Sequence, residues 1–133
     1  MSTIRRPQGA GKAARVRSPL VVRSKVWFEV GGRHVFGEGL ARLLEGVASS
    51  GTLRKAALDG GMSYRYAWGL VRGLEKNLES RLVLSRPGGP DGGGTELTDE
   101  GRGLLALYRR VSAAARAAAA RFRSERTRGG RIR

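Results

Sequence analysis

The sequence predicts an α+β fold that is mostly α-helical: a winged helix-turn-helix with an N-terminal β-hairpin and a long C-terminal dimerisation helix. Short runs of alternating apolar and polar residues indicate strands. Apolar residues recurring every three or four positions indicate helices, and glycine-rich segments lie between these elements. We expect a disordered basic tail (1–18), the hairpin and winged helix-turn-helix (19–97), the long helix (98–123) and a second basic tail (124–133).

A β-hairpin is predicted at the start of the folded part. Val26, Phe28 and Val30 stand at every second position, which is the spacing of a half-buried strand. The Gly31-Gly32 pair follows them, and glycine readily adopts the positive φ angles that a two-residue hairpin turn needs at both positions. Such a turn would pair Phe28 with Val35.

Three helices are predicted to follow the hairpin. The first covers about 38–49, where apolar residues recur at helical spacing. Thr52 stands where the N-cap of a second, short helix belongs, and Gly60-Gly61 ends that helix. Ser63 caps a third helix, over about 64–79. A helix, a short glycine turn and a capped helix form the helix-turn-helix pattern.

A wing and a final helix complete the predicted domain. Residues 82–84 and 95–97 indicate two short strands, and the glycine- and proline-rich stretch 87–94 between them excludes regular structure. Thr98 is expected to cap the last helix, and the acids that follow it suit a first helical turn.

The last helix carries an apolar stripe with heptad spacing and is longer than the small core can cover. We expect the excess to pack on a second copy of the chain, the alternative being that alanine-rich helix propensity alone forms it. The residues assigned to dimerisation are Leu104, Leu107, Tyr108, Val111, Ala115, Ala118 and Phe122.

The chain is strongly basic. Its 133 residues include 26 Lys+Arg and 11 Asp+Glu, which gives a formal net charge of +15. Five cations and no acid lie in 1–18, and six arginines with one acid lie in 121–133, so two thirds of the excess charge belongs to the tails. Nucleic acid is the leading partner class for such a charge.

Composition excludes several other functions. The chain has no cysteine and one histidine, His34, so we expect no disulfide, no metal site and no cysteine nucleophile. Its carboxylates are scattered, and no spacing suggests a nucleophile with its base, so we expect no enzyme activity and no cofactor. No apolar run approaches the roughly 18 residues of a membrane span, so no membrane partner is expected.

The third predicted helix has a basic side that suits DNA. Arg65, Arg72 and Lys76 share this side with two glycines, and Trp68 is expected in the core on the opposite side. Cations on one face match a helix that enters the major groove, the alternative being a solvated charged face. The candidate DNA-binding residues are Thr52, Arg54, Lys55, Ser63, Tyr64, Arg65, Tyr66, Arg72, Lys76 and Arg86. For the two tyrosines, packing at the helix edge is the alternative.

Several motifs together resemble a known family. Residues 61–68 (Gly-Met-Ser-Tyr-Arg-Tyr-Ala-Trp), 86–89 (Arg-Pro-Gly-Gly) and 92–98 (Gly-Gly-Gly-Thr-Glu-Leu-Thr) resemble the N-terminal LysR-like winged-helix domain of the ModE family, which are molybdate-responsive bacterial transcription regulators. The similarity covers about residues 24–111.

This resemblance implies a homodimer on double-stranded DNA, in the bacterial cytoplasm at the nucleoid. The recognition helix would begin at Ser63, and dimerisation would use the long helix. Full-length family members sense molybdate in a separate C-terminal domain. The chain ends at Arg133, so we expect no molybdate site in it.

Two functional hypotheses follow. The first is a sequence-specific, dimeric DNA-binding transcription regulator, with a recognition helix at about 63–79 in the major groove and a glycine-rich wing, 86–94, on flanking DNA. The alternative is a non-specific nucleoid-associated or RNA-binding basic protein, in which the tails would dominate and no sequence would be preferred.

Overall fold

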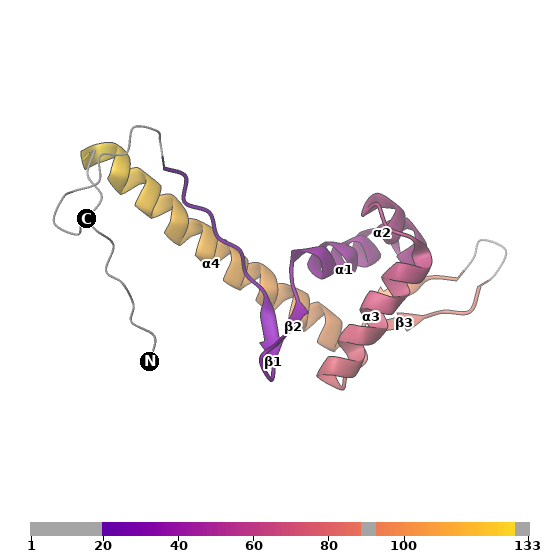
Figure 1. The fold of residues 1–133 in the computed structure, drawn as a ribbon. Coiled ribbons are helices and arrows are strands. Elements are labelled where there is room, and N and C mark those ends of the chain that lie inside the picture. The colour runs from indigo at the N-terminus through magenta and orange to yellow at the C-terminus, as the bar shows by residue number, and fades with distance from the viewer. Residues whose placement is uncertain (1–19, 89–92, 130–133) are drawn as a thin grey trace. The chain divides into compact units, whose positions relative to one another are not determined.

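The computed structural model describes residues 20–88 and 93–129, with side chains described as far as residue 122. Its elements, in order, are β1 (Phe28–Val30), β2 (Arg33–Phe36), α1 (Glu38–Ser50), α2 (Leu53–Asp59), α3 (Tyr64–Leu78), β3 (Val83–Ser85), β4 (Thr95–Leu97) and α4 (Asp99–Gly129) (Figure 1). Within the described residues the fold is therefore mostly helical with two small antiparallel hairpins, which is compatible with the predicted α+β winged-helix class.

The chain divides into two compact units. The main unit is Lys25–Ala113, and of the described residues 20–24 and 114–129 belong to the second. The predicted tail 1–18 lies outside the described residues. Helix α4 continues to Gly129, past its predicted end at 123, because residues 104–128 contain no glycine or proline.

The β1–β2 hairpin has the predicted turn but a different register. Gly31 and Gly32 have φ angles of 57° and 78°, as a two-residue turn requires. Phe28 pairs with Phe36, however, and not with Val35, because a bulge separates Phe28 from Glu29. The bulge turns both phenylalanine rings toward the core, where their centroids lie 5.4 and 5.2 Å from that of Tyr108.

Tyr108, which the heptad pattern assigns to dimerisation, is occupied within its own chain. It is only 1% exposed, and its hydroxyl donates a hydrogen bond of 2.8 Å to the carbonyl of Val26. Position 108 therefore faces the core that the hairpin and α1 share with α4, and it is not available to a second copy of the chain.

The three central helices begin and end where the sequence predicts. Thr52 caps α2 by accepting a 3.1 Å hydrogen bond from the amide of Lys55, and Ser63 caps α3 by accepting one of 3.1 Å from the amide of Tyr66. Helices α1 and α2 approach closely at Gly46, where an added Cβ would lie 2.7 Å from the Cβ of Ala56. The caps thus fix where α2 and α3 begin, and Gly46 allows α1 and α2 to pack closely.

The β3–β4 hairpin follows α3 directly. Val83 pairs with Leu97 and Ser85 with Thr95, so the first strand begins one residue later than predicted. Thr98 caps α4 as expected, because its hydroxyl oxygen accepts a 3.0 Å hydrogen bond from the amide of Gly101. Of the predicted loop 87–94, residues 89–92 lie outside the described residues.

A buried carboxylate joins α3 to β3, which the sequence pattern did not predict. Glu75 is 8% exposed, and its Oε2 accepts hydrogen bonds from the amides of Leu82 (2.8 Å) and Val83 (3.4 Å). Its Oε1 lies 3.3 Å from Nη1 of Arg72. The residue thus supplies acceptors to two buried amides at the start of the second hairpin.

We predict that Glu75→Ala lowers the free energy of unfolding by about 1–3 kcal/mol, because the amides of Leu82 and Val83 would stay buried without an acceptor. Urea unfolding followed by circular dichroism measures the change. The matched control is Lys76→Ala on the exposed face of the same helix, for which we expect a change within about 0.5 kcal/mol. Equal effects of the two substitutions would contradict the role given to Glu75.

Candidate nucleic-acid interface

Helix α3 buries one side and exposes the other, as its sequence pattern requires. Ala67, Val71 and Leu74 are buried in the core. Arg65, Arg72 and Lys76 are all exposed, and so are the two glycines between them. The predicted basic face therefore lies on the surface of the main unit.

The start of α3 is held to α2 by an aromatic contact. The guanidinium of Arg54, near the start of α2, lies 4.4 Å from the ring centroid of Tyr64. Tyr64 in turn meets Trp68 edge to face, with the ring centroids 6.2 Å apart. Trp68, expected in the core, is half-buried at the edge of the core, and Arg72 covers its ring at 4.8 Å.

The candidate cations fall into two groups. Arg54, Arg65 and Lys76 form no ion pair with any residue that the structure describes. The other three pair within their own chain: Lys55 with Asp59, Arg72 with Glu75, and Arg86 with Glu96. The first group can therefore meet an external anion without giving up an internal carboxylate.

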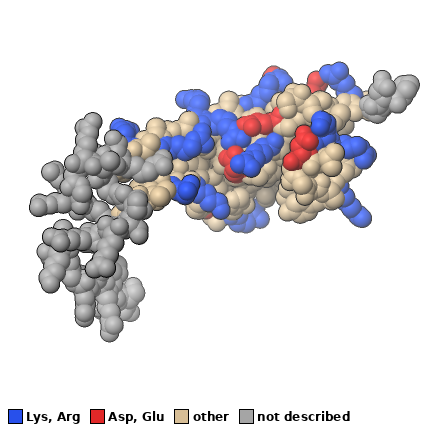
Figure 2. Space-filling view, turned by 90° about the horizontal axis from the view of Figure 1, so that it is seen from above, with Lys and Arg blue, Asp and Glu red and all other residues tan. Residues whose placement is uncertain are grey.

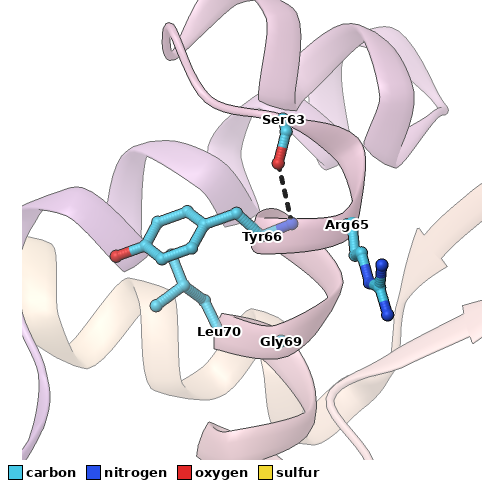
Figure 3. Close-up of a pocket in the computed structure, with 5 residues that line it drawn as sticks. All are labelled: Ser63, Arg65, Tyr66, Gly69 and Leu70. Carbon is cyan, nitrogen blue, oxygen red and sulfur yellow. Dashed lines mark hydrogen bonds between the residues drawn. The ribbon is translucent and has the colours of Figure 1, made fainter.

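A shallow hollow lies on the exposed face near the start of α3. It has a volume of about 420 Å³ and is lined by Ser63, Arg65, Tyr66, Gly69 and Leu70. Figure 3 shows the Arg65 side chain on one side of the helix and Tyr66 with Leu70 on the other, with Gly69 between them. The hollow thus joins an unpaired cation to apolar and aromatic surface. Leu70 is an addition to the predicted site, because helical spacing assigns it to the core.

An ion-pair cluster anchors α4 to α1 within the main unit. Arg109 donates from Nη1 to both carboxylate oxygens of Glu38, each at 3.0 Å, and its Nε donates to Glu45. Burial raises the pKa of Glu38, but hydrogen bonds from Arg109 and Arg42 outweigh it and hold that pKa below its ordinary value. These cations thus serve the fold.

Basic side chains are more prominent than acidic ones on the face of the molecule that Figure 2 shows. Lys and Arg side chains spread over the visible face, and the fewer Asp and Glu side chains lie among them (Figure 2). Within residues 20–88 and 93–129, no helix combines the length and apolar character needed to cross a bilayer.

The sequence is similar to those of several curated molybdenum-related proteins. The chain is 42% identical over 67 residues to the molybdenum-pterin-binding protein MopA of Rhodobacter capsulatus. The matched segment covers 50% of this chain and 25% of MopA. It is 40% identical over 68 residues to the molybdenum transport protein ModE of Azotobacter vinelandii, covering 51% and 25%. It is 39% identical over 66 residues to the DNA-binding transcriptional dual regulator ModE of Escherichia coli K12, covering 50% and 25%.

The chain is a homologue of the ModE and Mop proteins. The resemblance that the sequence motifs indicate is thereby confirmed. The chain spans about a quarter of the length of these curated relatives, so the homology concerns one part of them. No protein-family profile matches the chain.

We predict that Arg72→Ala lowers the free energy of unfolding by about 1 kcal/mol, because Glu75 loses its cation and the Trp68 ring loses its guanidinium cover. Arg65→Ala, at an exposed position without an ion pair, should change it by less than about 0.5 kcal/mol. Chemical denaturation of both variants distinguishes these roles. If Arg65→Ala proved the more destabilising change, Arg65 would have a structural role that the described contacts do not include.

Proposed function

We propose that this chain is a sequence-specific DNA-binding transcription regulator that acts as a homodimer. Helix α3 serves as the recognition helix in the major groove, and the β3–β4 hairpin serves as a wing on flanking DNA. The observation that carries the proposal is the unpaired Arg65 and Lys76 on the exposed face of a capped helix, in a homologue of ModE regulators.

The residues divide by the part of DNA that they suit. Arg65 offers a bidentate fork for the O6 and N7 atoms of guanine. Ser63 and the amides at the start of α3 suit a phosphate, because a helix N-terminus favours negative charge. Thr52, Arg54 and Lys55 at the start of α2 suit a backbone phosphate on the other side of the turn.

Three further candidates have secondary roles. Lys76 lies at the far end of the exposed face and suits a phosphate. Arg86 at the base of the wing and Arg72 are held by carboxylates, so each would exchange an internal partner for DNA. Tyr64 holds Arg54 in place through its ring.

The homodimer would use the apolar stripe of α4, whose members are exposed or half-buried among the residues that the structure describes. In the main unit, Leu107 is 48% exposed, Val111 is exposed and Leu104 is half-buried. In the second unit, Phe122 is 64% exposed. The stripe consists of Leu104, Leu107, Val111, Ala115, Ala118 and Phe122, and its spacing is that of a helix-pairing seam.

Non-specific binding to DNA or RNA is the weaker candidate. It rests on the charge of the flanking segments 1–18 and 124–133 and makes no use of the shaped face of α3. Binding through those segments would be strongly salt-dependent and would not distinguish sequences. Deleting both segments tests it, because only sequence-specific binding should survive the deletion.

We predict that selection from random duplex DNA at moderate salt enriches an inverted repeat. Its half-site centres should lie about 34–36 Å apart, or a multiple of that, because two recognition helices of a dimer enter successive major grooves. Arg65→Ala should reduce discrimination at one base pair of each half-site by about 1–3 kcal/mol. Titration of point-substituted sites measures this change.

Two results would contradict this proposal. Selection that enriches no sequence would favour the non-specific alternative. Equal weakening of all sequences by Arg65→Ala would assign Arg65 to the phosphate backbone instead of a base. Lys76→Ala is the control, since loss of a phosphate contact should weaken all sequences about equally.

The proposed dimer can be tested with one substitution in its apolar seam. Leu107→Glu should convert the dimer to a monomer in analytical ultracentrifugation, because it places a charge in the apolar seam. Affinity for the inverted repeat should fall by at least about tenfold, since the two half-sites are no longer linked. Ala106→Glu, on an exposed neighbouring position of the same helix, should leave both unchanged. A wild-type chain that stays monomeric at micromolar concentration would refute the seam.

A further inference from the structure

The hollow on α3 has two chemically different sides. Arg65 lines one side and is a cation without a carboxylate partner among the described residues. Tyr66 and Leu70 line the other, one helical turn apart, and the Tyr66 side chain is directed outward from the helix (Figure 3). Tyr66 is 60% exposed, so most of its ring surface is open to a partner.

The hollow exists because position 69 lacks a side chain. A Cβ at Gly69 would meet nothing within 4 Å, so no packing contact in the described residues requires glycine there. Glycine destabilises a helix interior by roughly 1 kcal/mol relative to alanine. The absence of this side chain does leave room for a partner to approach the backbone between Arg65 and Tyr66.

The chemistry of the hollow suits one base-pair edge. In the major groove, thymine is the base that presents a methyl group, and apolar side chains recognise it. A tyrosine ring and a leucine side chain offer that methyl group an apolar contact. A phosphate would find at most one donor on this side, the Tyr66 hydroxyl, and the Leu70 side chain offers it neither a donor nor a charge.

We propose that Tyr66 and Leu70 bind the 5-methyl group of a thymine, next to the base pair that Arg65 contacts. This inference rests on the proposed function, since it requires α3 to lie in the major groove. It makes Tyr66 a specificity-determining residue and explains its exposure. Gly69 forms the floor over which the thymine edge passes.

The test removes only the methyl group. Each thymine position of the selected site is replaced in turn by deoxyuridine, in both half-sites at once. The dissociation constant is measured for each replacement at fixed salt. At one position the wild-type chain should bind about fourfold more weakly per methyl group lost, the effect of one buried methyl. Tyr66→Ala should show a smaller preference for the thymine site over the uracil site than the wild-type chain, because only Leu70 is left to contact the methyl group.

Matched variants separate this role from a structural one. Tyr66→Phe keeps the ring and should keep the preference for thymine. Gly69→Ala should reduce that preference without lowering the melting temperature, whereas Gly103→Ala, at an exposed position on α4, should leave it intact.

The inference fails if no thymine in the selected site is sensitive to loss of its methyl group. It also fails if Tyr66→Ala retains the full preference for thymine over uracil. In both cases specific binding by the wild-type chain would leave the proposed function standing. Failure to select any site would instead contradict the proposed function, and the inference with it.

Discussion

The interaction on which the candidate interface depends is the buried carboxylate of Glu75. It accepts hydrogen bonds from the amides of Leu82 and Val83, where the chain leaves α3 and enters the second hairpin. It also pairs with Arg72, whose guanidinium covers Trp68. One side chain therefore links the far end of α3 to β3 and orders the middle of its exposed face. An apolar side chain at position 75 would leave two buried amides without an acceptor. The hydrogen bonds that hold the start of the hairpin to α3 would then be lost.

Local chemistry explains how much of this arrangement the sequence predicts. The caps at Thr52, Ser63 and Thr98 and the turn at Gly31-Gly32 depend only on neighbouring residues, and all are found where the pattern predicts them. The errors concern contacts between distant segments. The bulge beside Phe28 arises because two rings must reach the Tyr108 ring, which lies far along the chain. The burial of Glu75 depends in the same way on β3, and the periodicity of α3 holds no information about that strand.

Some cations on the described surface form ion pairs within the chain. A simple count of cations therefore overestimates how many are available to bind DNA. Arg109 gives its donors to Glu38 and Glu45 and thereby fixes α4 on α1. Arg102 gives a donor to the carbonyl of Leu97 and another to Asp99. Such cations are already compensated within the chain, and moving them to a phosphate would exchange one partner for another. The cations that can add binding energy are those without a carboxylate partner in the part of the chain that the structure describes, and two of them, Arg65 and Lys76, lie on α3.

The glycines of the main unit are of two kinds: some are required by close packing, and others leave space for a partner. At Gly46 and Gly101 an added Cβ would come within 2.7 Å of Ala56 and 2.3 Å of the Leu82 carbonyl, so the fold itself requires glycine there. At Gly69 and Gly73 the same Cβ would meet nothing within 4 Å, although both positions lie inside α3, where alanine would favour the helix. Both glycines of α3 lie on its exposed, basic side, and its buried side has none. This helix therefore gives up stability only where an external partner can come close to its backbone.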